Sequence, residues 1–221
     1  HEGVDLPAGT PPLLWTALRA AWRTVAFAAA AMLPSLLLGS LLGFGAATAW
    51  WSGDTRRARF AAPISAGCRL VAALLRSVHE LLWAVLFLAA FGVTPLAALA
   101  ALTLPYAGTL AKVFAEMIDE APRPAARALQ QAGATGAQVF AFGLLPRALP
   151  DMTAYALYRF ECALRSAAVL GFFGFPTLGY HLAASFENLY YGEVWTYLYV
   201  LLILVVVVDW WSGAVRRRLV G

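Results

Sequence analysis

Long uncharged runs are the feature that most limits how this chain can fold. Residues 24–53 contain no Asp, Glu, Lys or Arg over 30 positions, and residues 81–111 contain none over 31. A helix needs about 20 apolar residues to cross the hydrocarbon core of a bilayer. Only 13% of all residues are charged, against about 25% in a soluble domain. We therefore predict an all-α, polytopic membrane protein.

Turn signals and aromatic residues divide the chain into five predicted spans. The sequence Phe-Gly-Val-Thr-Pro at 91–95 interrupts the longest run. A further run over 166–186 is broken early by glycines, so its helix is expected to begin near Asp151. Residues 194–208 are flanked by tryptophans typical of membrane interfaces. The predicted spans form a single transmembrane domain over 1–221 and cover about 14–50, 70–91, 95–115, 151–172 and 194–212.

The segment between the third and fourth spans is predicted to be a helical loop outside the hydrocarbon. Residues 128–146 are uncharged, but they include three glutamines and several glycines. Such a composition is too polar for a spanning helix. The loop over about 116–146 is therefore the longest polar connection between two predicted spans.

Arginine clusters predict the orientation. With five spans, the three clusters fall on one side of the membrane, which the positive-inside rule assigns to the cytoplasm. The loop over 173–193 has no Lys or Arg and carries Glu187 and Glu193, so it is expected outside with the N-terminus. The clusters are Arg56, Arg57 and Arg59; Arg123, Arg127 and Arg147; and Arg216, Arg217 and Arg218.

Several kinds of chemistry are disfavoured by the residues present. The only lysine, Lys112, is followed by Val113, so the Gly-Lys pair of a P-loop is missing. The three histidines and two cysteines have no zinc-site spacing. The basic residues lie beside apolar runs, which favours membrane topology over nucleic-acid binding. We predict no catalytic residue, no metal and no cofactor held by this chain, and a membrane enzyme is the weakest alternative.

The polar loop carries a spaced pattern of small residues, glycine and Leu-Pro. Gly133 follows Arg127-Ala128-Leu129 after three residues, and Leu145-Pro146 follows Gly133 after eleven more. This spacing resembles the coupling loop of permease subunits of type I ABC importers, with Arg127 in place of the family's Glu and Gly143 in place of its Ile. The resemblance assigns ATPase docking to Arg127, Ala128, Leu129, Gly133, Ala134, Leu145 and Pro146.

The resemblance extends over residues 15–218 and is closest to permeases of phosphonate importers. Residues 76–81, 155–171 and 209–218 carry it outside the loop. It implies a type I ABC importer permease fold in a bacterial inner membrane, with the coupling loop and the C-terminus in the cytoplasm. Its implied partners are a second permease, identical or paired, an ABC ATPase dimer that binds ATP and Mg, and a periplasmic or lipid-anchored binding protein. Such permeases usually carry one more N-terminal span, so we expect a truncated chain.

One segment departs from the phosphonate permeases. After the fourth span they usually have Gly-Ala-Gly-Gly-Ile-Gly, whereas this chain has Gly174-Phe-Pro-Thr-Leu-Gly179. The resemblance therefore implies an outer gate at Gly174, Pro176 and Gly179 with a different shape. Phosphite, hypophosphite or another phosphonate are the substrates that this difference suggests.

Three charges lie inside the predicted fourth span: Arg159, Glu161 and Arg165. A charge at mid-bilayer costs about 2.5–3.5 kcal/mol on insertion scales, so each needs a partner or water. Glu161 and Arg165 are four residues apart and share a helix face, so they can pair. One hypothesis is that an arginine lines the substrate pathway and attracts an anion. The other is an ion pair that fixes helix packing, with His79 or Glu80 as further partners; a channel or proton-coupled transporter built on this cluster is the rival function.

Overall fold

Helices account for all secondary structure within residues 12–49 and 55–220, which the computed structural model describes together with the side chains of 12–49 and 62–218. The prediction of an all-α chain is confirmed. The elements are α1 (Leu13–Ala46), α2 (Thr55–Ser77), α3 (Glu80–Phe91), α4 (Pro95–Glu120), α5 (Pro124–Gln131), α6 (Gly136–Gln138), the π-helix η1 (Val139–Leu144), α7 (Leu145–Val169), the 3₁₀-helix η2 (Leu170–Phe173), α8 (Leu178–Glu187) and α9 (Tyr191–Val220).

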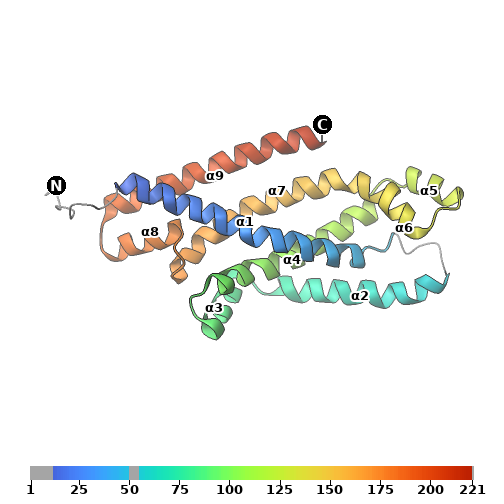
Figure 1. The fold of residues 1–221 in the computed structure, drawn as a ribbon, viewed down its shortest axis with the longest axis horizontal. Coiled ribbons are helices and arrows are strands. Elements are labelled where there is room, and N and C mark those ends of the chain that lie inside the picture. The colour runs from blue at the N-terminus through green and yellow to red at the C-terminus, as the bar shows by residue number, and fades with distance from the viewer. Residues whose placement is uncertain (1–11, 50–54, 221) are drawn as a thin grey trace.

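The long helices run along one axis of the molecule (Figure 1). Helices α1, α4 and α9 are each long and apolar enough to cross a membrane. Two bent pairs, α2 with α3 and the α6–η2 segment with α8, bring the number of candidate spans to as many as five. Helices α5 and α6 lie at one end of the axis, and α8 lies at the other end with the start of α1 (Figure 1).

The predicted helix over 70–91 is wrong, because two helices meet there at 82°. Helix α2 ends at Ser77 and α3 begins at Glu80. His79 adopts an extended backbone conformation, and its Nδ1 accepts a hydrogen bond from the backbone N–H of Leu81 at 3.3 Å. A side chain that satisfies a free N–H in this way starts a new helix. The break coincides with the polar stretch over 76–80, which the predicted helix includes.

Other predicted boundaries also shift. Helix α7 begins at Leu145 instead of near Asp151, and α4 continues to Glu120. The connection predicted over 173–193 contains helix α8. Polar residues at the start of α7 and at the end of α4 lower the local hydropathy, so the predicted spans are shorter than the helices. The side chains of Arg56, Arg57 and Arg59 lie outside the described side chains.

Helix α4 is the centre of the bundle and contacts α1, α2, α3 and α7. Glycines allow its close approach to two of them. A Cβ on Gly39 of α1 would lie 2.7 Å from Leu110 Cβ, and a Cβ on Gly108 of α4 would lie 2.7 Å from the carbonyl oxygen of Ala72 in α2. Helices in membranes associate through small residues because lipid provides no hydrophobic driving force between them.

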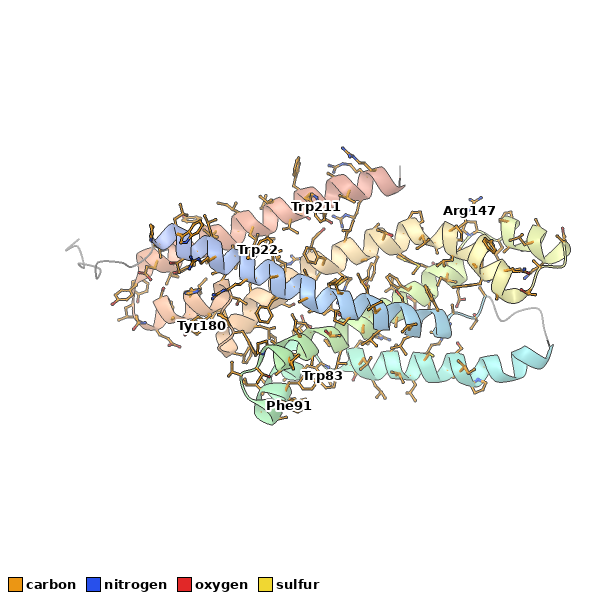
Figure 2. All side chains as sticks on the ribbon, in the orientation of Figure 1. Trp22, Trp83, Phe91, Arg147, Tyr180 and Trp211 are labelled. Atoms are coloured by element: carbon orange, nitrogen blue, oxygen red, sulfur yellow. The ribbon has the colours of Figure 1, made fainter. Side chains whose placement is uncertain are left out.

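The outward faces of the bundle are rich in apolar and aromatic side chains (Figure 2). The most apolar stretch of α9 has only 6% of its residues buried. Trp22 and Tyr180 lie toward the end that holds α8, whereas Arg147 lies beside α5 at the other end (Figure 2). Aromatic residues prefer the membrane–water interface, and this distribution agrees with a chain embedded in a bilayer.

Replacing Gly108 with alanine is expected to destabilise the bundle. The added methyl group has no room between α4 and α2, and overpacking of this kind costs about 1–3 kcal/mol. The matched control is Gly67→Ala in α2, where a Cβ meets nothing within 4 Å. Unfolding in mixed detergent micelles should occur at lower denaturant for Gly108→Ala and at the same or higher denaturant for Gly67→Ala. Equal midpoints for the two variants would contradict the packing argument.

Candidate functional site

The loop over 116–146 contains the short helix α5, which ends in a hydrogen-bonded turn. Helix α5 ends at a turn in which Ala134 N donates to the carbonyl oxygen of Leu129, and Gly133 N donates to that of Gln130, each at 3.0 Å. This pair of bonds is a Schellman motif, which needs a left-handed residue after the helix. Gly133 provides it with a φ of 82°. The glycine of the sequence pattern is therefore required by the backbone.

The chain re-enters a helix directly after this turn. Thr135 Oγ1 accepts a hydrogen bond from Gln138 N at 3.4 Å, and Gln138 Oε1 accepts one from Thr135 N at 2.8 Å. This reciprocal arrangement is a capping box. From Gly136 the chain continues through η1 into α7. The predicted loop over 116–146 is thus a helix–turn–helix, with little irregular backbone.

Gly143 allows α5 to lie against η1. A Cβ at this position would lie 3.1 Å from Ala126 Cα and 3.2 Å from Leu129 Cδ1. Beneath this contact, Ala126, Val139 and Leu144 form a small buried cluster. The isoleucine of the family pattern would not fit this arrangement, so the substitution noted in the sequence accompanies a close contact between the two elements.

The structure separates the predicted docking residues into an outer and an inner group. Arg127, Ala128, Gly133 and Pro146 are exposed. The other three are half-buried and support the turn from within: Leu129, Ala134 and Leu145. A protein that docks on this end of the molecule therefore meets the exposed side of α5 and the turn at Gly133.

Asp119, at the end of α4, anchors the connection that leaves α1, and it was not identified from the sequence. Its Oδ1 accepts hydrogen bonds from the backbone N–H groups of Thr48 at 2.8 Å and Ala49 at 2.9 Å. Its Oδ2 accepts one from Arg69 Nη2 at 3.0 Å, and Arg69 Nε donates to the carbonyl oxygen of Ala46. The partners are 50 to 71 residues away in sequence, so no local pattern indicates this network.

Arg159, in the middle of α7, has no anionic partner among the described side chains. The guanidinium carbon of Arg159 is 4.5 Å from the ring centre of Tyr106 in α4. Its Nε is buried and has no hydrogen-bond partner among the described residues. The ion pairs of the described part of the chain do not include Arg159 either. A cation–π contact alone compensates only part of the cost of such a charge.

A chain of hydroxyl groups leads from Tyr106 to a carboxylate. The Tyr106 hydroxyl oxygen is 3.1 Å from Ser166 Oγ, and Ser166 Oγ donates to Glu80 Oε1 at 2.9 Å. Glu80 Oε2 is 3.7 Å from His79 Nε2. These contacts join α3, α4 and α7. Glu80 was predicted as a partner of the arginines, but its hydrogen bond is to a hydroxyl group.

Glu161 pairs with α9, and the predicted pair with Arg165 is wrong. The buried Glu161 Oε1 is 3.2 Å from Arg216 Nη2, which is also 4.0 Å from Asp209 Oδ1. The Glu161 contact is an ion pair without hydrogen-bond alignment. Arg165 is exposed, and its Nη2 lies 3.8 Å from Cys162 Sγ. A tertiary partner on another helix replaces the local one that the spacing suggested.

Two of the predicted gate residues, Gly174 and Pro176, lie in the turn between η2 and α8, and Gly179 lies in the first turn of α8. Gly174 ends η2 in the left-handed conformation with a φ of 91°. Gly179 is buried, and a Cβ there would collide with the backbone of α7. Pro176 is exposed, and Leu178 N donates to Thr24 Oγ1 of α1 at 3.0 Å. The turn is therefore held against α1 and α7 at the end opposite α5.

A groove with charged side chains in its lining opens at the α5 end. Its volume is about 650 Å³. Arg147, Asp151 and Tyr155, spaced by four residues, line it from α7, and Arg216 lines it from α9. Arg159 continues this spacing one helical turn, about 5.4 Å, farther along. The groove also brings residues of two arginine clusters, Arg147 and Arg216, to the same end of the molecule.

Alanine at position 133 is expected to destabilise the turn after α5. The left-handed conformation costs a residue with a Cβ about 1–2 kcal/mol, and a Cβ there meets nothing within 4 Å, so no new steric contact adds to this cost. Hydrogen exchange of the α5 C-terminal amides should be faster in Gly133→Ala. Gly133→Asn is the control, because asparagine tolerates this conformation better. Unchanged exchange in Gly133→Ala would refute the role of the backbone.

One protein family and several permease proteins are similar in sequence to this chain. Residues 18–221 match the family described as "Binding-protein-dependent transport system inner membrane component". The phosphite transport system permease protein PtxC of Stutzerimonas stutzeri is 40% identical over 153 residues, which are 68% of this chain and 54% of that protein. The putative phosphite transport system permease protein HtxE of the same organism is 35% identical over 147 residues, 66% of this chain and 56% of that protein. The chain thus spans about half the length of these curated relatives.

Solved structures share the fold. A chain of the MetNI methionine ABC transporter in an inward-facing conformation aligns with a TM-score of 0.77 at 22% identity, over 95% of this chain and 99% of that one. A chain of an amino acid ABC transporter aligns with a TM-score of 0.76 at 15% identity, over 92% and 94%. The resemblance to ABC importer permeases is therefore confirmed, and the chain belongs to the family of inner membrane components of binding-protein-dependent transport systems.

Proposed function

We propose that this chain is the permease subunit of an ATP-driven importer for a phosphorus oxyanion, such as phosphite or a phosphonate. Family membership supports the transport class, and two relatives that are 35–40% identical are named as phosphite permeases, one of them as putative. The observation that carries the anionic substrate is Arg159, a guanidinium inside the bundle with a buried Nε that lacks a partner among the described residues. Such a group binds phosphorus oxyanions through charge-assisted hydrogen bonds.

The coupling loop is the proposed docking site of a separate ATPase dimer, which would bind ATP and Mg. Helix α5 lies at the end of the molecule (Figure 1), and its residues Arg127 and Ala128 are exposed. The Schellman turn at Gly133 and the capping box that follows hold this helix in a fixed orientation. Because the path from Gly136 into α7 is helical, movement of the docked ATPase would be passed directly to α7.

The substrate pathway is proposed to form between this chain and a second permease subunit, identical or paired. Helix α7 contributes Arg159 and also carries Glu161 and Arg165, the other pathway candidates. The groove below Arg159 opens at the α5 end, which supports release of substrate on the side where the ATPase docks. The turn at Gly174, Pro176 and Gly179 closes the opposite end and is the proposed outer gate, where a binding protein would deliver substrate.

In the proposed topology the α5 end and the C-terminus face the cytoplasm of a bacterium. The arginines that line the groove at this end support that orientation through the positive-inside rule. The start of α1 and helix α8 would then face the binding protein.

The first test is uptake by the complete importer in proteoliposomes, with its ATPase and binding protein. We expect uptake of phosphite or 2-aminoethylphosphonate only when ATP is supplied on the α5 side. Uptake that needs no ATP would instead support a self-sufficient channel or proton-coupled transporter. ATP hydrolysis that is stimulated by the binding protein with another ligand, but never with a phosphorus oxyanion, would refute the proposed substrate class and keep the transport class.

Replacing Arg159 with glutamine is expected to reduce uptake by about tenfold or more, since hydrogen bonds to charged groups are worth about 1.5–3 kcal/mol. Arg165→Gln, measured alongside, should cause a smaller loss because this side chain is exposed. ATP hydrolysis by the docked ATPase should persist in both variants. Wild-type uptake in a correctly folded Arg159→Gln protein would show that Arg159 only contributes to helix packing.

A further inference from the structure

The hydroxyl groups of Tyr106 and Ser166 form a chain that ends at one carboxylate. Ser166 Oγ has a single hydrogen and two acceptors within reach, Glu80 Oε1 at 2.9 Å and the carbonyl oxygen of Cys162 at 3.3 Å. The carboxylate is the nearer acceptor and carries a charge, which favours it as the partner. With the Ser166 hydrogen directed at Glu80, the Tyr106 hydroxyl donates to Ser166 Oγ at 3.1 Å, and the two hydrogen bonds strengthen each other. Ser166 thus presents its hydrogen to an anionic oxygen, and Glu80 occupies that position.

A positive charge lies over the ring of the same tyrosine. Arg159 packs on the ring of Tyr106, whereas Glu80 is reached only through the two hydroxyl groups. The arginine and the carboxylate therefore do not form an ion pair in the described structure. The Glu80 carboxylate is tethered to α3, whereas a free anion with three or four oxygens could accept from Ser166 with one oxygen and from Arg159 with another. Tetrahedral phosphorus oxyanions have this geometry and favour arginine.

We propose that Arg159, Tyr106 and Ser166 form an oxyanion subsite of the substrate pathway, and that Glu80 is an internal competitor which occupies its Ser166 donor in this conformation. This inference rests on the proposed function and adds a specificity site to it. Substrate binds when Glu80 leaves Ser166, and the return of Glu80 favours release of the substrate. The competition prevents the subsite from retaining the anion, as a transport pathway requires.

The position of Glu80 in the fold allows it to leave. It is the first residue of α3, directly after the 82° break that follows α2. Ala84 is the only buried residue of α3, and Trp83, Phe87 and Leu88 pack partly buried against the core, so α3 is held against the bundle while Glu80 lies at its free end. Discontinuous helices with a binding site beside the break are a recurring feature of membrane transporters. A small rotation of α3 at His79 would withdraw the carboxylate from Ser166 and leave Tyr106 and Arg159 in place.

The test measures equilibrium binding of radiolabelled inorganic phosphite to the complete permease–ATPase assembly in detergent, without the binding protein. Removing the competitor with Glu80→Ala should tighten phosphite binding by tenfold or more. Combining it with Arg159→Gln, or with Ser166→Ala, should abolish that gain. Glu116→Ala is the matched control, because this exposed carboxylate of α4 pairs with Lys112 at 3.5 Å and is not part of the subsite. It should bind phosphite as the unmodified protein does.

Unchanged or weaker binding in Glu80→Ala would overturn the inference, as would a gain that survives the loss of Arg159. If Glu80→Ala fails to fold, Glu80→Gln replaces it, since the amide keeps an acceptor for Ser166 but has no charge. The gain is then expected to be smaller but still dependent on Arg159, and its absence would equally refute the competition. ATP-driven phosphite uptake by the unmodified importer is measured in parallel. If that uptake is present while the Glu80 variants show no gain, only the subsite inference fails.

Discussion

The close packing of α4 against α1 and α2 is the interaction on which the other features depend. Gly39 and Gly108 bring the helix backbones together where no side chain would fit. Small residues are effective here because lipid does not drive helices together and van der Waals contact must do so. Helix α4 then places Tyr106 under Arg159 in the middle of the bundle, and Asp119 beside the α1–α2 connection at its end. One helix thereby positions both the polar cluster and the base of the docking loop.

Two charged residues of α7, Glu161 and Arg159, differ in the partners that they contact. Glu161 is buried and pairs with Arg216 of α9, which links the last helix to the bundle. Arg159 has an aromatic ring beneath it and no carboxylate partner in the described structure. A paired charge stabilises a defined arrangement of helices, whereas an unpaired guanidinium retains its affinity for a mobile anion. This difference separates a structural role for Glu161 from the proposed transport role of Arg159.

The proposed docking loop and the polar cluster are connected by a continuous run of helix. The Schellman turn at Gly133 leads through the capping box into η1 and α7. Arg147, Asp151 and Tyr155 line the groove along the first part of α7, and Arg159 lies one turn beyond. A tilt of α5 would therefore change the position of these groups together. The contacts between Gly143 and α5 make the loop part of that element instead of a flexible link.

The sequence by itself determined the all-helical membrane class, the position of the polar loop and the family, because uncharged runs and the spacing around Gly133 are local properties of the chain. It also drew attention to Arg159 and Glu161, since charges are costly in hydrocarbon. Only the tertiary structure decided their partners. Glu161 pairs across to α9, and Asp119 binds groups 50 to 71 residues away. Such contacts depend on which helices become neighbours, and the local sequence does not contain that information.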